Sequence, residues 1–210
     1  MFEWISSHHQ IINALANVSM LIVWVAYLQV FVGSYRRQRR SRILVNRGVG
    51  SGLAARCLIS NMSAEAIYIQ SVIATLEISE ERWTSPVTDL RGLAEHQSHP
   101  DLKLATRQGP LLAGYFMDIG TFDGLIDHVL HHGGRRDGLD EEKFWKQLRA
   151  LEITVVAVHG PDDLLVGAKR RFDIARQEGE LRLKAHTVDT EQIRSRRERR
   201  RIAEMRKRDL

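Results

Sequence analysis

The chain has 210 residues, of which 43% are hydrophobic and 27% are charged, and its formal net charge at pH 7 is +5. This composition is ordinary for a folded protein, and the length allows one or two domains. Cys57 is the only cysteine, which excludes an internal disulfide. The cysteine content therefore gives no indication that the protein resides in an oxidising compartment.

Positive charge is concentrated at two places along the chain. The first cluster consists of Arg36, Arg37, Arg39, Arg40 and Arg42. The second cluster lies at residues 191–208, which contain nine Arg and Lys residues and three Glu residues. With Glu3 and Asp209 also set aside, the middle of the chain, residues 43–189, has a net charge of about −4 by the same count. A mildly acidic body therefore lies between two basic flanks.

The most apolar stretch, residues 11–33, contains 23 residues without a formal charge. A helix of this length covers about 34 Å, enough for a hydrocarbon core of about 30 Å. A cleavable signal peptide would need a basic start, a shorter apolar core and a small-residue cleavage site. The start "MFEWISSHHQ" contains Glu3 and no Lys or Arg, so the sequence predicts a retained transmembrane helix.

Orientation follows from the first arginine cluster, because positively charged segments resist translocation. Residues 34–42 form a basic juxtamembrane segment, whose five arginines we expect to remain in the cytoplasm and to contact anionic lipid headgroups. Residues 1–10 then form a short extracytoplasmic N-terminus, and the rest of the chain is cytosolic. The preference for arginine over lysine hints at a GC-rich bacterial genome, so we expect a bacterial cytoplasmic (inner) membrane.

One face of the predicted span is polar. Asn13 and Asn17 are four residues apart, and helical spacing continues this face to Met20 and Trp24. A neighbouring helix can satisfy an amide in the membrane for about 1 kcal/mol per bond. This face is therefore predicted to dock on another transmembrane helix, in a homo-oligomer or a hetero-complex. The alternative is that both Asn lie near the outer interface, where water reaches them.

Three glycines, Gly48, Gly50 and Gly52, follow the apolar run at 43–45 and raise the question of a phosphate-binding loop. The dinucleotide fingerprint has the spacing G-x-G-x-x-G between a strand and a helix, whereas this stretch reads G-x-G-x-G-x-A. Too few residues follow for a crossover between parallel strands, and no Gly-Lys-Ser/Thr follows for a P-loop. We therefore expect a flexible bend between two strands.

The segment 43–187 is predicted to be a cytosolic, mainly β domain. "ARCLIS" and "AIYIQSVIATLEI", joined by the turn formers "NMSAE", predict a β-hairpin. Residues 79–108 resemble a long connection, and residues 109–120 a short strand between glycine turns. Buried or alternating strands follow at 152–160 and from 168 onward.

Two helices are predicted to interrupt these strands. "TFDGLIDHVLHHGG" carries one apolar stripe, with Thr121 as its cap and Gly133 at its end. The second helix starts at Asp140, and Phe144, Leu148 and Leu151 form its apolar side. Short antiparallel strands with one or two helices favour a β-sandwich-like, α+β fold.

Residues 188–210 are predicted to be a basic tail, either helical or disordered, because they carry too few apolar residues to bury a face. An anionic membrane surface would attract such a segment. Nucleic acid is not the expected partner, because the tail lacks aromatic residues on which bases could stack.

The helix over 122–132 carries three histidines that are weak candidates for a metal site. His128 and His132 are four residues apart, and His131 stands four residues after Asp127. The alternative is that His128, His131 and His132 are ordinary residues near a helix C-terminus, where partial positive charge is favoured. We predict no metal and no cofactor.

No set of acids, bases and nucleophiles converges in the sequence, so no catalytic residue and no enzymatic activity are predicted. We expect a non-enzymatic, membrane-anchored interaction protein, an accessory subunit or scaffold that presents its β domain at the inner leaflet. One alternative is a membrane-tethered sensor domain that binds a small ligand or metal. A weaker one is a nucleotide-dependent enzyme using the Gly48, Gly50 and Gly52 loop, which requires that residues 43–78 do not form an antiparallel pair.

Overall fold

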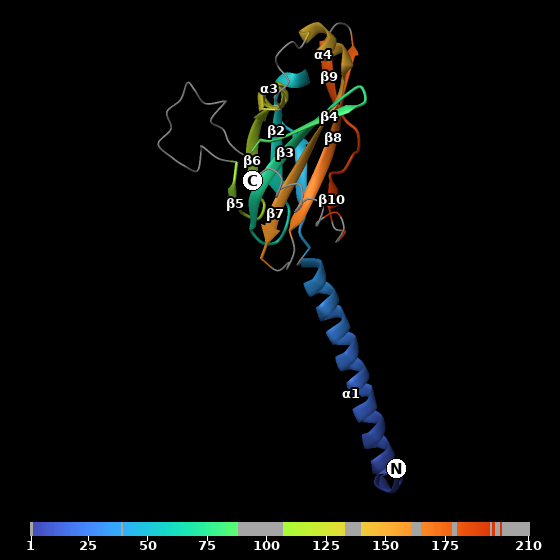
Figure 1. Cartoon of the computed structure of the whole chain (residues 1–210). Coiled ribbons are helices and arrows are strands. Elements are labelled where there is room, and N and C mark those ends of the chain that lie inside the picture. Colours follow the sequence, from blue (N-terminus) through green and yellow to red (C-terminus); the bar gives the residue numbers. More distant parts are fainter. Residues whose placement is uncertain are drawn as a thin grey trace. The chain divides into compact units, whose positions relative to one another are not determined.

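The computed structural model contains two separate compact units, Met1–Arg40 and Ser41–Leu210 (Figure 1). It describes residues 2–38, 40–87, 107–132, 140–160, 165–177 and 180–193, together with residues 195 and 198. The first unit is one helix, and the second is a mainly β domain.

Helix α1 covers Phe2–Gln38. Its segment Gln10–Arg36, 27 residues, is long and apolar enough to cross a membrane, and among the described residues the most apolar part of it is exposed. The predicted span at 11–33 lies inside this segment. Leu, Ile, Val and Ala make up most of it, and the absence of an internal Pro lets the helix run without a break.

In the described residues of the β domain, the strands form two antiparallel sheets. The smaller has the strand order β1-β2-β6, and the larger has β10-β8-β7-β3-β4, with β5 paired to β3 and β9 paired to β8. The smaller sheet is formed by β1 (Ile43–Arg47), β2 (Arg56–Asn61) and β6 (Phe116–Thr121). The larger is formed by β3 (Ile67–Ile78), β4 (Glu81–Pro86), β5 (Gly109–Leu111), β7 (Leu148–His159), β8 (Val166–Gln177), β9 (Glu180–Ala185) and β10 (Glu191–Ile193).

Both sheets and helix α3 (Phe122–His132) contribute side chains to one hydrophobic core. Alternate residues of β1 and β2 point into it, as Val45 and Ile59 do, each fully buried. Phe122 of α3 meets Phe172 of β8 edge to face, with ring centroids 4.8 Å apart. Strand β7 carries apolar residues on both faces. On the face away from the main core, Val156 packs against Ile193 of β10. The predicted mainly β domain with one or two helices is confirmed at this level.

The predicted hairpin between β2 and β3 is wrong, because the two strands belong to different sheets. Asn61, fully buried, directs the chain across: its side-chain amide donates to the carbonyls of Glu65 and Leu111, and its side-chain oxygen accepts from the Ser63 N–H. The residues "NMSAE" therefore form a crossover instead of a tight turn. The hairpin partner of β2 is β1.

Other predicted boundaries shift where strands are longer or more numerous than the pattern suggests. The segment expected to be a connection contains β4, and the single strand expected at 109–120 is two strands, β5 and β6. The second helix, α4 (Glu141–Gln147), begins as predicted after Asp140 but is shorter. Leu148 and Leu151 belong to β7, because burial in the sheet core outweighs the helical preference of leucine.

The outer edge of β1 is covered by side chains from the end of the domain. The hydroxyl of Thr190 accepts from the Val45 N–H at 3.0 Å, and the amide of Gln192 both accepts from the Ile43 N–H at 3.0 Å and donates to the Ile43 carbonyl at 2.6 Å. Arg170 donates to the Val45 carbonyl at 2.6 Å. These contacts satisfy backbone groups that an open edge would leave unpaired. Residues 188–193, assigned from sequence to the tail, thus include part of the domain.

We predict that Thr190→Val lowers the free energy of unfolding by about 1–3 kcal/mol, because it leaves the buried Val45 N–H without its acceptor while preserving side-chain shape. Thr187→Val is the matched control, since the Thr187 hydroxyl bonds only at the exposed surface. Denaturant unfolding of the detergent-solubilised full chain, followed by near-ultraviolet circular dichroism, measures both. Equal midpoints for the two variants would contradict the covering role.

Candidate binding pocket

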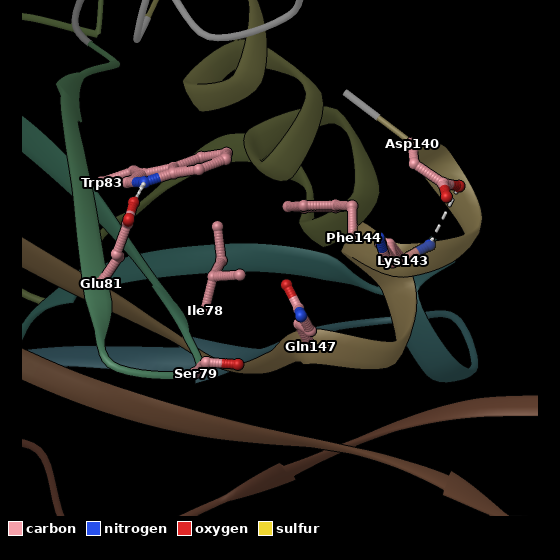
Figure 2. A pocket seen from close by; sticks show the side chains of 8 residues that line it. All are labelled: Ile78, Ser79, Glu81, Trp83, Asp140, Lys143, Phe144 and Gln147. Atoms are coloured by element: carbon pink, nitrogen blue, oxygen red, sulfur yellow. Dashed lines mark hydrogen bonds between the residues drawn. The ribbon is translucent and has the colours of Figure 1, made fainter. Parts of the chain in front are cut away.

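A pocket of about 370 Å³ lies where the β3–β4 turn meets helix α4 (Figure 2). Its size is at the lower end of the range typical of small-ligand sites. Strands β3 and β4 and the turn between them contribute one wall, and α4 with its capping residue contributes the other. The lining residues are Ile78, Ser79, Glu81, Trp83, Asp140, Lys143, Phe144 and Gln147.

The inner part of the pocket is apolar and aromatic. Trp83 and Phe144 stack with ring centroids 6.2 Å apart and an angle of 19° between their planes. Ile78 and Phe144 are buried, whereas Trp83 keeps part of its surface exposed. The indole N–H of Trp83 donates to the Glu81 carboxylate at 2.9 Å, which fixes the ring orientation, as Figure 2 shows. A planar or apolar group can therefore pack beside an oriented indole.

The rim of the pocket is polar, and part of it is committed to holding the backbone. The Asp140 carboxylate caps α4 by accepting from the N–H groups of Glu142 and Lys143. Ser79 has φ +54 and its N–H donates to the Gln147 carbonyl at 3.1 Å, which ties the β3–β4 turn to the end of α4. Lys143 and Gln147 supply an ammonium and an amide beside the apolar floor. This arrangement suits binding and orientation of a partner group.

The pocket was not predictable from the sequence. Trp83 falls in the segment expected to be a long connection, and Phe144 was assigned only to the apolar side of its helix. The one local signal was the Asp140 cap, which positions α4. Trp83 and Phe144 are 61 positions apart in the chain, so only the pairing of β4 with β3 and the docking of α4 bring them together.

The three glycines lie in the connection between β1 and β2, as the predicted bend requires. The two strands are antiparallel, with Arg47 opposite Cys57, so the parallel strand–helix–strand unit of a dinucleotide site is not formed. Gly50 has φ +117, and a Cβ there would lie 2.6 Å from the Ala55 Cα. The glycines therefore serve a tight turn that includes the short 3₁₀ helix Gly52–Ala54.

The histidines of α3 are held mainly by the backbone. His128 is buried and bonds the Pro86 carbonyl at 2.9 Å, while His131 and His132 bond the carbonyls of Asp127 and His128. The rings of His128 and His132 stack with centroids 4.1 Å apart. Over the described residues, no group of three or more His, Cys, Asp or Glu side chains is arranged to hold a metal ion.

The remaining predicted sites lie on or next to α1. Because α1 is one continuous helix, Asn13, Asn17, Met20 and Trp24 follow one face, and all four are exposed in the single chain. Arg36 ends the apolar segment, and Arg40 and Arg42 are exposed. The side chain of Arg37 and the whole of Arg39 lie outside the described residues.

Cys57 and Arg107 are titratable residues buried in the interior of the domain, apart from the pocket. Burial, assisted by Asp118, raises the pKa of the Cys57 thiol to about 12, so the thiol is protonated at neutral pH. Burial also lowers the pKa of Arg107 to about 10, although its guanidinium donates to the Val87 carbonyl at 2.7 Å. The Nε and Nη2 atoms of Arg107 are buried without a hydrogen-bond partner in the described structure.

Comparison of the chain with protein-family models, with curated proteins and with solved structures found no match.

We predict that the domain loses stability as the pH falls below about 6.5, in part through His128. Burial lowers the pKa of His128 in the folded state below the ordinary histidine value of 6.5, and His132, Arg107 and His131 lower it further, against the raising effect of the Pro86 carbonyl. The unfolded state therefore takes up a proton first, and the stabilisation present above pH 6.5 is lost as the pH falls towards the folded-state value.

Thermal unfolding of the full chain between pH 7.5 and pH 5 (the range bracketing a histidine titration) measures this effect. His128→Gln keeps a side-chain donor for the Pro86 carbonyl and should flatten the profile, whereas the exposed His131→Gln should not. Parallel profiles for all three proteins would contradict the assignment.

Proposed function

We propose that this protein is a membrane-anchored interaction protein, an accessory subunit or scaffold that presents its β domain at the cytoplasmic face of a bacterial inner membrane. The observation that carries the proposal is the apolar segment Gln10–Arg36, which exposes its side chains all round. A helix of this kind in water would expose a large apolar surface, and a bilayer removes that cost. The proposed orientation has the N-terminus outside and the arginine cluster inside.

The face formed by Asn13, Asn17, Met20 and Trp24 supports association with another transmembrane helix. Both amides lie on the same side of α1, and both side chains are exposed on the helix. In lipid each amide gains about 1 kcal/mol from a partner on a neighbouring helix. A second copy of α1 or the helix of another subunit would supply that partner.

The position of the pocket within the domain supports presentation to a partner in solution. Strand β3 starts at Ile67, beside the crossover from β2, and ends at Ile78 in the pocket. Twelve residues of strand separate these ends by about 36 Å. The pocket therefore lies at the end of the domain remote from Ile43, the first residue of β1, which pairs with Asn61. An aromatic or apolar side chain of a partner protein fits its oriented floor.

A second candidate function, a sensor domain that binds a small ligand, is favoured by the same pocket. Its aromatic floor and its polar rim of Lys143 and Gln147 have the composition of a ligand site. The two functions differ in what Trp83 contacts: a side chain of a stably bound subunit in one, a free small molecule in the other.

We predict that the full chain, extracted from its own host in mild detergent, is part of an assembly that Asn13→Leu with Asn17→Leu disrupts. Loss of two interhelical bonds, about 2 kcal/mol together, would weaken association roughly 30-fold. Gln29→Leu is the control, because Gln29 stands sixteen positions after Asn13 and so lies on the opposite side of α1.

Native mass of the detergent complex is the measurement. A large assembly with distinct subunits that is lost in the double variant and kept in the control would support the accessory-subunit role and identify the partner. A monomer of unchanged mass in all three proteins would contradict the accessory-subunit role and favour the sensor function.

A further inference from the structure

Four apolar side chains gather at one end of the β domain, and each is more than half exposed. Tyr115, directly before β6, and Phe116, its first residue, are 62% and 63% exposed, and Met62 and Leu112 are each 55% exposed. We call these four residues the aromatic rim. Clustered large apolar side chains on a surface mark a contact site more often than scattered ones do.

Backbone contacts place the aromatic rim beside the residues through which the chain enters the domain. The Met62 N–H donates to the Arg42 carbonyl at 2.8 Å, and the Asn61 N–H donates to the Tyr115 carbonyl at 2.9 Å. The Tyr115 N–H in turn donates to the Leu112 carbonyl at 3.1 Å. Strands β1, β2 and β6 are neighbours in one sheet, so two strand spacings, about 10 Å, separate the backbone of Arg42 from that of the aromatic rim on β6.

Covalent connectivity limits how far this end of the domain can be from the membrane anchor. Arg42 follows Gln38, the last residue of α1, by only four positions. Four residues span at most about 14 Å when fully extended, whatever the arrangement of the two units. If α1 crosses a bilayer, the end of the domain that holds the aromatic rim is tethered close to the headgroups.

From these contacts we infer that the aromatic rim is a second membrane contact, in which its aromatic and aliphatic side chains enter the headgroup region of the bilayer that α1 crosses. The inference rests on the proposed membrane anchoring of α1. Aromatic side chains are favoured at this depth, Tyr in particular. Arg42, whose carbonyl accepts from the Met62 N–H, and Arg40, two positions before it in the chain, are exposed and complement anionic headgroups. These two arginines outnumber the one carboxylate in the β2–β3 crossover, Glu65.

Val49 is an exposed apolar residue of the same domain that lies away from the aromatic rim. Val49, in the β1–β2 turn, is 88% exposed, but it stands alone at the opposite end of the smaller sheet. It therefore offers a matched control within the same domain. Cys57 is fully buried, so a thiol-reactive label goes to an introduced cysteine in the folded chain.

The experiment uses the full chain with one added cysteine, Tyr115→Cys, Leu112→Cys or Val49→Cys, labelled with bimane. Each protein is reconstituted into vesicles of phosphatidylglycerol and phosphatidylcholine, with or without brominated acyl chains, which quench a fluorophore near the bilayer. We expect loss of bimane emission at positions 115 and 112 in brominated vesicles and unchanged emission at position 49. Two rim positions guard against a local effect of either substitution.

Flotation of the vesicles tests the anchor separately. Unquenched rim labels on protein that floats with the vesicles would overturn the membrane contact and leave the anchor in place. Equal quenching at positions 49, 112 and 115 would also overturn it, as unspecific adsorption. Rim emission that changes with protein density, and not with brominated lipid, would assign the rim to a second copy of the chain. Protein that fails to float would overturn the anchor itself.

Discussion

The β domain depends on the packing of a small sheet against a large one. Val45, Cys57 and Ile59 of the smaller sheet are fully buried in a core that they share with residues of β3, β7, β8 and α3. Burial of this kind contributes about 1.5–3 kcal/mol for each large aliphatic side chain. The smaller sheet therefore depends on the rest of the domain for the burial of these side chains. The outer edge of β1 is stabilised by hydrogen bonds from Thr190 and Gln192, which joins the first strand of the domain to residues about 145 positions later.

The parts of the fold that were predictable are those with a local cause. An uncharged apolar run of sufficient length specifies α1 by itself, and the stripe of Phe122, Leu125 and Val129 specifies α3. The apolar run that ends at His159 indicates a buried strand, although not where β7 begins. In each case the signal lies within one or two dozen neighbouring residues.

The parts that were not predictable depend on partners far apart in the chain. A turn-forming segment does not reveal that the buried amide of Asn61 takes its partners from Leu111 as well as Glu65, which makes a crossover instead of a hairpin. The polar alternation of β4 resembles a loop until β3 pairs with it. The pocket could not be predicted for the same reason, since Trp83 and Phe144 meet only after sheet formation and helix docking. The Thr190 and Gln192 contacts with β1 join residues more than 140 positions apart, which a local pattern cannot show.

In the proposed account, the two ends of the domain have different tasks: the end beside Arg42 remains at the bilayer and the pocket end meets a partner. Its central claim is the topology, with α1 retained in the membrane and the domain on the side of the arginines. The most direct test is labelling of Ser7→Cys and Val188→Cys by a membrane-impermeant maleimide in spheroplasts, since Val188 is 94% exposed and Cys57 is fully buried. The account predicts labelling of residue 7 in intact spheroplasts and of residue 188 only after permeabilisation. Labelling of residue 188 in intact spheroplasts, or recovery of the chain in the soluble fraction, would contradict it.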